Sequence, residues 1–189
     1  MNSANGGYAC GRIAPFVDAE TVEVTLLLPP PLETPLRVEP AGDGVRVFDG
    51  EALVAEGRPA ELTLDVPDAP DFVEASRVSA AQAVDANHPF PGCFTCGPAR
   101  EEGDGLRLRP GAAGGGLVVA PYRPADTAPE LVWAALDCPG AYAVDPGFAR
   151  GVSVLGRLTG RILGAVGVSG DNPAVIRAAA ISPRRPTPM

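Results

Sequence analysis

The first patterned stretch of the chain alternates apolar side chains with mostly polar ones. Residues 22–28 follow a period of two, which is typical of a half-buried strand, and the three prolines at 29–31 end it because they have no N–H groups for a ladder. The dipeptide Asp49-Gly50 favours a tight hairpin turn. Further short strands are predicted at 36–39, 45–48, 53–55 and 61–66. Together these runs predict an antiparallel meander.

Three stretches have the spacing of helices instead. Residues 5–17 mix glycine with apolar side chains and predict a short buried helix, and 71–84 predicts an amphipathic linker helix. At 129–144 an apolar helix pattern runs into a tight break at Asp137-Cys138-Pro139-Gly140 and resumes after it. More strands are expected at 106–108, 117–122 and 152–158. Helices and antiparallel strands in this order predict an α+β fold.

The chain also shows a weak internal repeat. Gly6-Gly7-Tyr8-Ala9 matches Gly140-Ala141-Tyr142-Ala143, and in both halves a long predicted strand follows the helix. We therefore expect two related halves joined by a linker. The expected boundaries are 1–66 for the first half, 67–104 for the linker helix and a Cys-x-x-Cys loop, 105–162 for the second half and 163–189 for an atypical tail.

The composition of the chain limits the kinds of partner that it can be expected to bind. A 46% apolar content is enough for a folded core, and a net charge of -8 argues against nucleic acid or an anionic membrane surface, because either would repel the chain. No apolar run is long enough to span a membrane, and no secretory signal pattern opens the chain. Four cysteines are too few for a disulfide framework, so we expect reduced thiols and a cytoplasmic protein.

Four strings carry a resemblance to a known family. They are Asn-Gly-Gly-Tyr-Ala-Cys-Gly at 5–11, His-Pro-Phe-Pro-x-Cys-Phe-x-Cys-Gly-Pro at 88–98, Gly-Asp-Gly-Leu-Arg at 103–107 and Ala-Leu-Asp-Cys-Pro-Gly at 135–140. Over residues 3 to about 162 the chain resembles an actinobacterial group of thioesterase-like hotdog proteins. The resemblance implies a tandem (double) hotdog fold, in which an antiparallel sheet wraps a central helix twice. It also implies hydrolysis of an acyl-CoA or acyl-carrier thioester. A double hotdog can be self-contained, but hotdog units usually pair through their sheets, so strands missing from this chain would favour a homodimer.

Two departures from this pattern are expected to matter. The first helix begins almost at Met1, so the first half lacks a leading strand, and 163–189 is rich in glycine and proline with little strand alternation. The closing strands of the second half are therefore expected to be missing. A truncated or frameshifted reading of a longer gene is our hypothesis for this tail, and it would leave sheet edges exposed.

The resemblance also assigns candidate site residues. In hotdog enzymes the helix N-terminus polarises the thioester carbonyl and a nearby acid handles the water. Asn5 and Asp137 are the catalytic candidates, with Asp137 as general base. The substrate-binding candidates are Gly6, Gly7, Tyr8 and Gly140. Structural roles stay open for all of them: an N-cap for Asn5, a turn cap for Asp137, close helix packing for the glycines and core packing for Tyr8.

The segment from Cys93 to Gly97 has the spacing of a zinc knuckle, a tight turn whose N–H groups point at cysteine sulfurs. His88 and Cys138 could complete four ligands. Since structural zinc sites usually show two Cys-x-x-Cys pairs, we favour packing in a proline-stiffened loop, with no metal or other cofactor, and keep zinc as the alternative.

Three functions therefore remain open from the sequence. The first is thioester hydrolysis, the second is a non-catalytic hotdog module that binds an acyl chain or a partner, and the third is a small zinc-knuckle structural protein. We do not expect a serine hydrolase, because no Gly-x-Ser-x-Gly string occurs. We do not expect a phosphate-binding loop either, because no glycine run has the required form.

Overall fold

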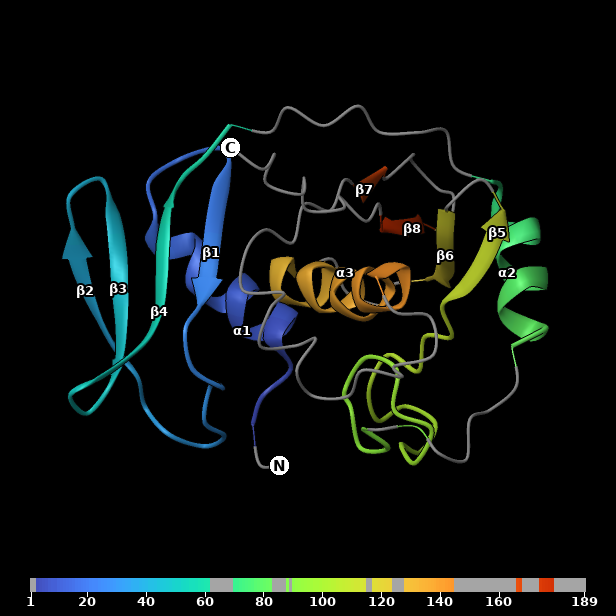
Figure 1. Cartoon of the computed structure of the whole chain (residues 1–189), viewed down its shortest axis with the longest axis horizontal. Helices are drawn as coiled ribbons and strands as arrows, with labels where there is room; N and C mark the ends of the chain where they lie inside the picture. The colour runs from blue at the N-terminus through green and yellow to red at the C-terminus, as the bar shows by residue number, and fades with distance from the viewer. Residues whose placement is uncertain are drawn as a thin grey trace, which may run out of the picture.

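The computed structural model describes residues 3–61, 70–82, 88, 90–114, 117–123, 128–144, 166–167 and 174–178. They form two antiparallel four-stranded sheets with helices between and beside them (Figure 1). The α+β class predicted from the sequence is confirmed. Among the described residues, no helix is both long and apolar enough to cross a membrane.

The first sheet has the strand order β1-β4-β3-β2 and every pairing in it is antiparallel. Its strands are β1 (Val22–Leu26), β2 (Arg37–Ala41), β3 (Gly44–Asp49) and β4 (Ala52–Pro59). The predicted meander is confirmed up to β4, while the strand expected at 61–66 falls almost wholly outside the described residues. Pro40 is tolerated inside β2 because β2 is an edge strand.

The first helix, α1 (Gly6–Ile13), continues into a 3-10 turn, η1 (Ala14–Phe16), as the glycine and apolar pattern of 5–17 predicts. One side of α1 packs on the first sheet and buries Cys10 and Ile13 against strand side chains. The buried core between them consists of Cys10, Ile13, Val17, Val24, Val45, Val47 and Ala55. This apolar contact fixes the position of the α1 N-terminus.

The second sheet has the order β5-β6-β8-β7. Its strands are β5 (Gly111–Gly114), β6 (Leu117–Tyr122), β7 (Val166–Gly167) and β8 (Ala174–Ala178). The expectation that the tail lacks strands is wrong, because β8 pairs with residues Val118 to Tyr122 of β6. Its run Ala-Val-Ile-Arg-Ala is too short for a clear alternation, and only pairing with a distant strand makes it part of a sheet. The strand expected at 152–158 lies outside the described residues.

The strand predicted at 106–108 is also wrong. Leu106 and Leu108 do alternate apolar side chains, but their N–H groups donate to Phe94 and Thr95 of a loop, at 2.8 and 2.7 Å. Arg107 has φ of 50°, a left-handed conformation that no regular strand contains. Residues 106–108 are therefore bonded to the Cys-x-x-Cys loop, and the strand of this region begins at Gly111.

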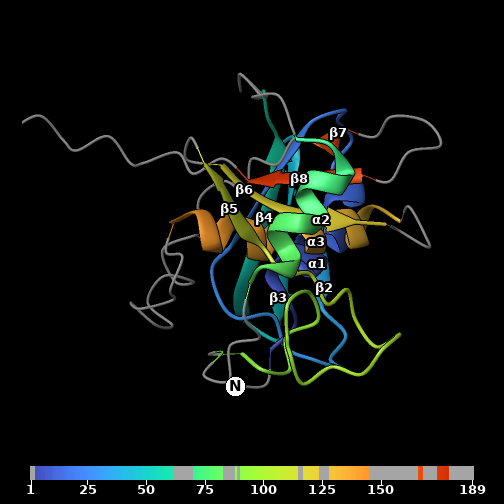
Figure 2. The same ribbon diagram turned by 90° about the vertical axis from the view of Figure 1, so that its right-hand side faces the viewer.

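The second sheet is covered by a helix on each face, as Figure 1 shows, and Figure 2 looks onto it from the side of the first of these helices. α2 (Phe72–Ala80) packs on one face against Val119, and α3 (Pro129–Val144) packs on the other against Ala120 and Tyr122, as the alternation along β6 requires. The linker helix predicted at 71–84 is confirmed but shorter. It ends at Ala80, and Val84 is outside the described residues.

The predicted break in the second helix is wrong, because α3 runs without interruption through Pro139. Proline removes one backbone hydrogen bond from a helix interior, yet this side chain is fully buried, and packing holds the helix together.

α1 and α3 lie side by side (Figure 1). Their contact uses Gly7 and Gly11, where a methyl group would collide with the backbone of Trp133 and Glu130. This close approach brings the N-terminus of α1 to the middle of α3.

Candidate metal centre

The loop 90–98 folds into a tight turn around its two cysteines. The N–H of Gly97 donates to the carbonyl of Cys93 at 2.9 Å, and the Cys93 sulfur accepts hydrogen bonds from the backbone of Thr95 and Cys96. Gly97 is required here, since a methyl group on it would lie 2.5 Å from the nitrogen and oxygen of Cys93. The segment therefore has the backbone form of a zinc knuckle, as its spacing predicted.

A third cysteine, Cys138, reaches this knuckle from α3. Its sulfur lies 3.0 Å from that of Cys96 and 3.6 Å from that of Cys93, and all three sulfur atoms lie within 4.8 Å of one another. Sulfur ligands of a tetrahedral zinc ion at the usual bond length of about 2.3 Å are separated by about 3.8 Å. The Cys93–Cys138 separation is close to this value, and the Cys96–Cys138 pair would have to move apart by about 0.8 Å to hold an ion.

Electrostatics prepares one of these thiols to lose its proton. Hydrogen bonds from Cys138 and then Cys96 stabilise a thiolate at Cys93 and hold the pKa of Cys93 well below its usual range. The hydrogen bonds of Cys138 with Cys93 and with Cys96, followed by burial, raise the pKa of Cys138 far above its usual value. A thiolate at the partly buried Cys93, beside the buried thiols of Cys96 and Cys138, attracts a cation, which would release the two remaining protons.

His88 lies beside the cluster and is buried. Its Nε2 is 3.4 Å from the sulfur of Cys96, while its Nδ1 accepts a hydrogen bond from the N–H of Phe90 at 3.1 Å. A neutral imidazole that accepts at Nδ1 carries its proton on Nε2. The observed arrangement therefore makes His88 an N–H donor to the Cys96 sulfur. The zinc alternative considered from the sequence had His88 as a fourth metal ligand instead.

The second feature of the site is a carboxylate at the α1 N-terminus. Oδ2 of Asp137 accepts from Nδ2 of Asn5 at 2.8 Å and from the N–H of Gly7 at 3.2 Å. Burial raises the pKa of Asp137 to about 6, although the hydrogen bonds from Gly7, Asn5 and Gly6 act in the opposite direction. Nδ2 of Asn5 also lies 4.0 Å from the sulfur of Cys93, so the carboxylate and the thiols are neighbours.

The remaining predicted site residues are placed as follows. Gly6 and Gly7 both direct backbone N–H groups at Asp137, and the N–H of Tyr8 donates to Oδ1 of Asn5, which is the N-cap of α1. The ring of Tyr8 packs edge-on against Phe94, with centroids 5.7 Å apart. Gly140 lies one turn beyond Asp137, with no described atom within 4 Å of a methyl group placed on it.

This arrangement changes the role expected of the α1 N-terminus. Its first N–H groups were expected to face a thioester carbonyl, but in the structure they are occupied by Asp137 and Asn5. The structure does bring together Asn5, Gly6, Gly7 and Asp137, and it places the knuckle beside them.

One residue of the site was missed by the sequence analysis. Thr95, between the knuckle cysteines, has no exposed surface, and its hydroxyl donates to the carbonyl of Ala134 on α3 at 2.9 Å. Nothing in the local sequence indicates this bond, because its partner is 39 residues away.

Comparison with known proteins adds no relative: no protein-family model, curated protein or solved structure matches this chain.

Proposed function

We propose that this chain is a zinc protein in which Cys93, Cys96 and Cys138 are the ligands and His88 supports the sulfur of Cys96. The observation that carries the proposal is the convergence of three thiols from two separate segments, with all three sulfur atoms within 4.8 Å of one another. We therefore prefer a zinc site to the interpretation that the sequence alone favoured, in which Cys93 and Cys96 only pack in the loop.

The form of the knuckle supports a metal over simple packing. Backbone N–H groups aimed at Cys93 stabilise a thiolate, which plain packing of a neutral thiol does not require. With three protein ligands, the fourth position of the tetrahedron is taken by water or another small ligand. The ion would tie the loop 90–98 to α3, since Cys138 lies on that helix.

Metal content tests this proposal directly. We expect about one zinc per chain in protein purified without a metal-affinity tag, measured by plasma emission, and almost none in the Cys93→Ser and Cys138→Ser variants. Cys10→Ala is the matched control, because Cys10 is also a buried free cysteine but belongs to the core around α1. Wild-type protein that stays without zinc after refolding in its presence would overturn the proposal.

The role of His88 has its own readout. As an N–H donor to a ligand, His88 should contribute roughly a 10- to 100-fold effect on zinc affinity without being required for binding. His88→Ala should therefore still bind one ion, and its Co²⁺ derivative should keep the sulfur-to-cobalt absorption of the wild type. Complete loss of the metal in His88→Ala would instead make it a ligand.

A second candidate function is favoured by the contact between Asn5 and Asp137. Two antiparallel sheets, one packed on α1 and the other on α3, and the contact between these two helices support a tandem hotdog fold. In such a fold Asp137, held by Asn5 at 2.8 Å, would direct water at the carbonyl of an acyl-CoA or acyl-carrier thioester. An incoming carbonyl would have to displace Asp137 from the N–H of Gly7, and for this reason we place hydrolysis second.

Turnover of a panel of acyl-CoA thioesters, followed by thiol release, tests hydrolysis. Asp137→Asn should abolish turnover and keep binding, while Asp18→Asn, at an exposed position, should leave both unchanged. Saturable acyl-CoA binding without turnover in the wild type would contradict hydrolysis and support a non-catalytic acyl-binding module. Both candidates fit the reducing cytoplasm that we propose as the location.

A further inference from the structure

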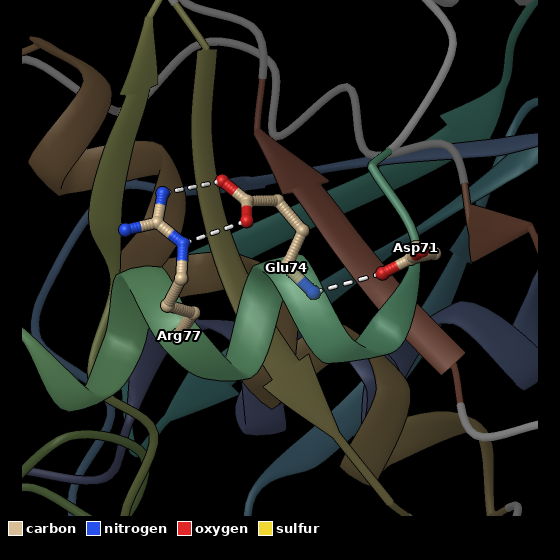
Figure 3. Close-up of polar contacts among 3 residues, drawn as sticks. All are labelled: Asp71, Glu74 and Arg77. Atoms are coloured by element: carbon tan, nitrogen blue, oxygen red, sulfur yellow. Dashed lines mark hydrogen bonds and ion pairs between the residues drawn. The ribbon is translucent and has the colours of Figure 1, made fainter.

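The arginines of this chain fall into two groups. Six of those whose side chains the structure describes are paired with carboxylates. An example is Arg77 on α2, which is held by two hydrogen bonds to Glu74 just after the N-cap Asp71 (Figure 3). Arg107, Arg109 and Arg123 form no ion pair with any described residue, and all three line the same cavity. Unpaired arginines that gather in one place are unexpected in a chain with a net charge of -8.

The cavity has a volume of about 730 Å³, which is within the range of small-molecule sites. It lies between α2, the segment 103–109, the end of β6 and the first turn of α3. α2 contributes the hydroxyl-bearing Ser76 and Ser79, and the apolar part of the wall includes Leu106, Leu108, Tyr122 and Leu131.

Local structure explains how two of the arginines reach the cavity. Leu106 and Leu108 pack against β6 and α3, with Leu108 buried and Leu106 partly buried. Arg107 and Arg109 alternate with these leucines along the chain and are exposed. The N–H groups of Leu106 and Leu108 are fixed to the carbonyls of Phe94 and Thr95. Arg107 is thereby held at a φ of 50°, a conformation that costs a non-glycine residue on the order of 1 kcal/mol.

The third arginine is positioned by an aromatic ring. The guanidinium of Arg123 lies 4.8 Å from the centroid of Phe72, at the start of α2. This contact restrains the side chain but leaves its N–H groups available for an acceptor.

Carboxylates near the cavity are already engaged by other arginines. Both carboxylate oxygens of Asp104 lie 3.0 Å from Arg100, and Glu130 on α3 pairs with Arg12. Glu74 on α2 is taken by Arg77. These three carboxylates therefore pair with arginines outside the cavity, and none of them forms an ion pair with Arg107, Arg109 or Arg123.

We propose that this cavity binds a phosphorylated small organic molecule, with Arg107, Arg109 and Arg123 on its phosphate oxygens. Guanidinium groups match phosphate geometry with paired N–H donors, and three of them suit a multiply charged anion. The cavity is much larger than a phosphate ion, and its apolar wall offers a surface for an organic portion. The proposal does not depend on the zinc centre or on hydrolysis.

Calorimetric titration with inorganic phosphate, pyrophosphate, ADP and adenosine tests it. ADP should bind more tightly than pyrophosphate if the organic part is recognised, and adenosine should bind much more weakly than either. Single variants Arg107→Gln, Arg109→Gln and Arg123→Gln should each weaken ADP binding by about tenfold or more, as expected for losing hydrogen bonds to a charged group.

Arg46→Gln is the matched control, because Arg46 is an exposed arginine on β3 paired with Glu56. It should bind ADP like the wild type, and zinc content should be unchanged in all four variants. Failure of both ADP and pyrophosphate to bind, or equal weakening by Arg46→Gln and the cavity variants, would overturn the proposal. Those results would leave the zinc measurement unaffected.

Discussion

The hydroxyl of Thr95 donates a 2.9 Å hydrogen bond to the carbonyl of Ala134, and neither residue has any exposed surface. Thr95 lies between the two knuckle cysteines, and Ala134 is one helical turn before Cys138. This bond therefore fixes the knuckle next to the turn of α3 that carries Cys138, so that the Cys138 thiol lies beside those of Cys93 and Cys96.

Thr95→Val tests that relationship. Valine keeps the shape of threonine but removes the donor, so we expect the free energy of unfolding to fall by about 1–2 kcal/mol and zinc affinity to fall with it. Urea unfolding and competition with a zinc chelator measure the two effects. In Thr34→Val the lost bond, to the carbonyl of Leu32, is exposed, and this control should change neither quantity appreciably. Equal effects of the two substitutions would contradict an anchoring role for Thr95.

The glycine contact between α1 and α3 makes a second prediction. In Gly7→Ala the new methyl group would collide with the carbonyl of Trp133 and approach Cβ of Asp137, so the helices must separate. We expect a loss of roughly 3 kcal/mol in stability, together with displacement of Asp137 from the α1 N-terminus.

Gly140→Ala is the contrasting helix substitution, since no described atom lies within 4 Å of its added methyl group. Alanine favours helix by up to about 1 kcal/mol over glycine, so this variant should be as stable as the wild type or more so. Thermal unfolding of both variants checks the pair. A Gly7→Ala protein as stable as Gly140→Ala would show that the helices do not need this contact.

Cys10 provides a prediction for pH. Burial, aided by the negative charge of Asp137, raises the pKa of Cys10 to about 12 in the folded chain. Above the unfolded value of 9.0 the unfolded chain loses this proton and the folded chain keeps it, so stability falls as pH rises. At about pH 10 the loss should be on the order of 1 kcal/mol.

Comparison with Cys10→Ala isolates this effect from the other cysteines. The alanine variant should be less stable at neutral pH, because it removes buried sulfur from the core. The difference between the two proteins in urea unfolding should then shrink from pH 7 to pH 10. A constant difference across that range would mean that Cys10 does not titrate as its burial requires.

Gly105 links the two proposed sites. It has φ of 93°, and a methyl group there would lie 2.5 Å from the carbonyl oxygen of Phe94, inside the knuckle. Gly105→Ala should therefore weaken both zinc binding and ADP binding. Gly42→Ala, in the turn between β2 and β3, has φ of 66° and no described atom near the added methyl, so it should cost only the backbone strain of about 1 kcal/mol and leave both kinds of binding unchanged. Chelator competition and calorimetry on both variants test this, and unchanged zinc binding in Gly105→Ala would separate the sites.

Local patterns identified much of the fold and some of the site. The alternation at 22–28 and the spacing at 71–84 depend on side chains a few residues apart, and each produced the predicted element with small differences at its ends. Asn5, Asp137 and the knuckle cysteines were also identified as candidate site residues from the sequence. The structure shows which of them touch: Asn5 contacts Asp137, and both knuckle cysteines contact Cys138.

The sequence by itself determined which residues can form helices and strands, because periodicity and turn chemistry act over a few residues. Only the tertiary structure decided the rest: β8 became a strand by pairing with β6, 106–108 became part of a loop by bonding to Phe94 and Thr95, and α3 continued through Pro139. The same long-range packing brought Cys138 to the knuckle and Asp137 to the α1 N-terminus. Such contacts depend on how elements far apart in sequence bury their surfaces together, and no local pattern records that.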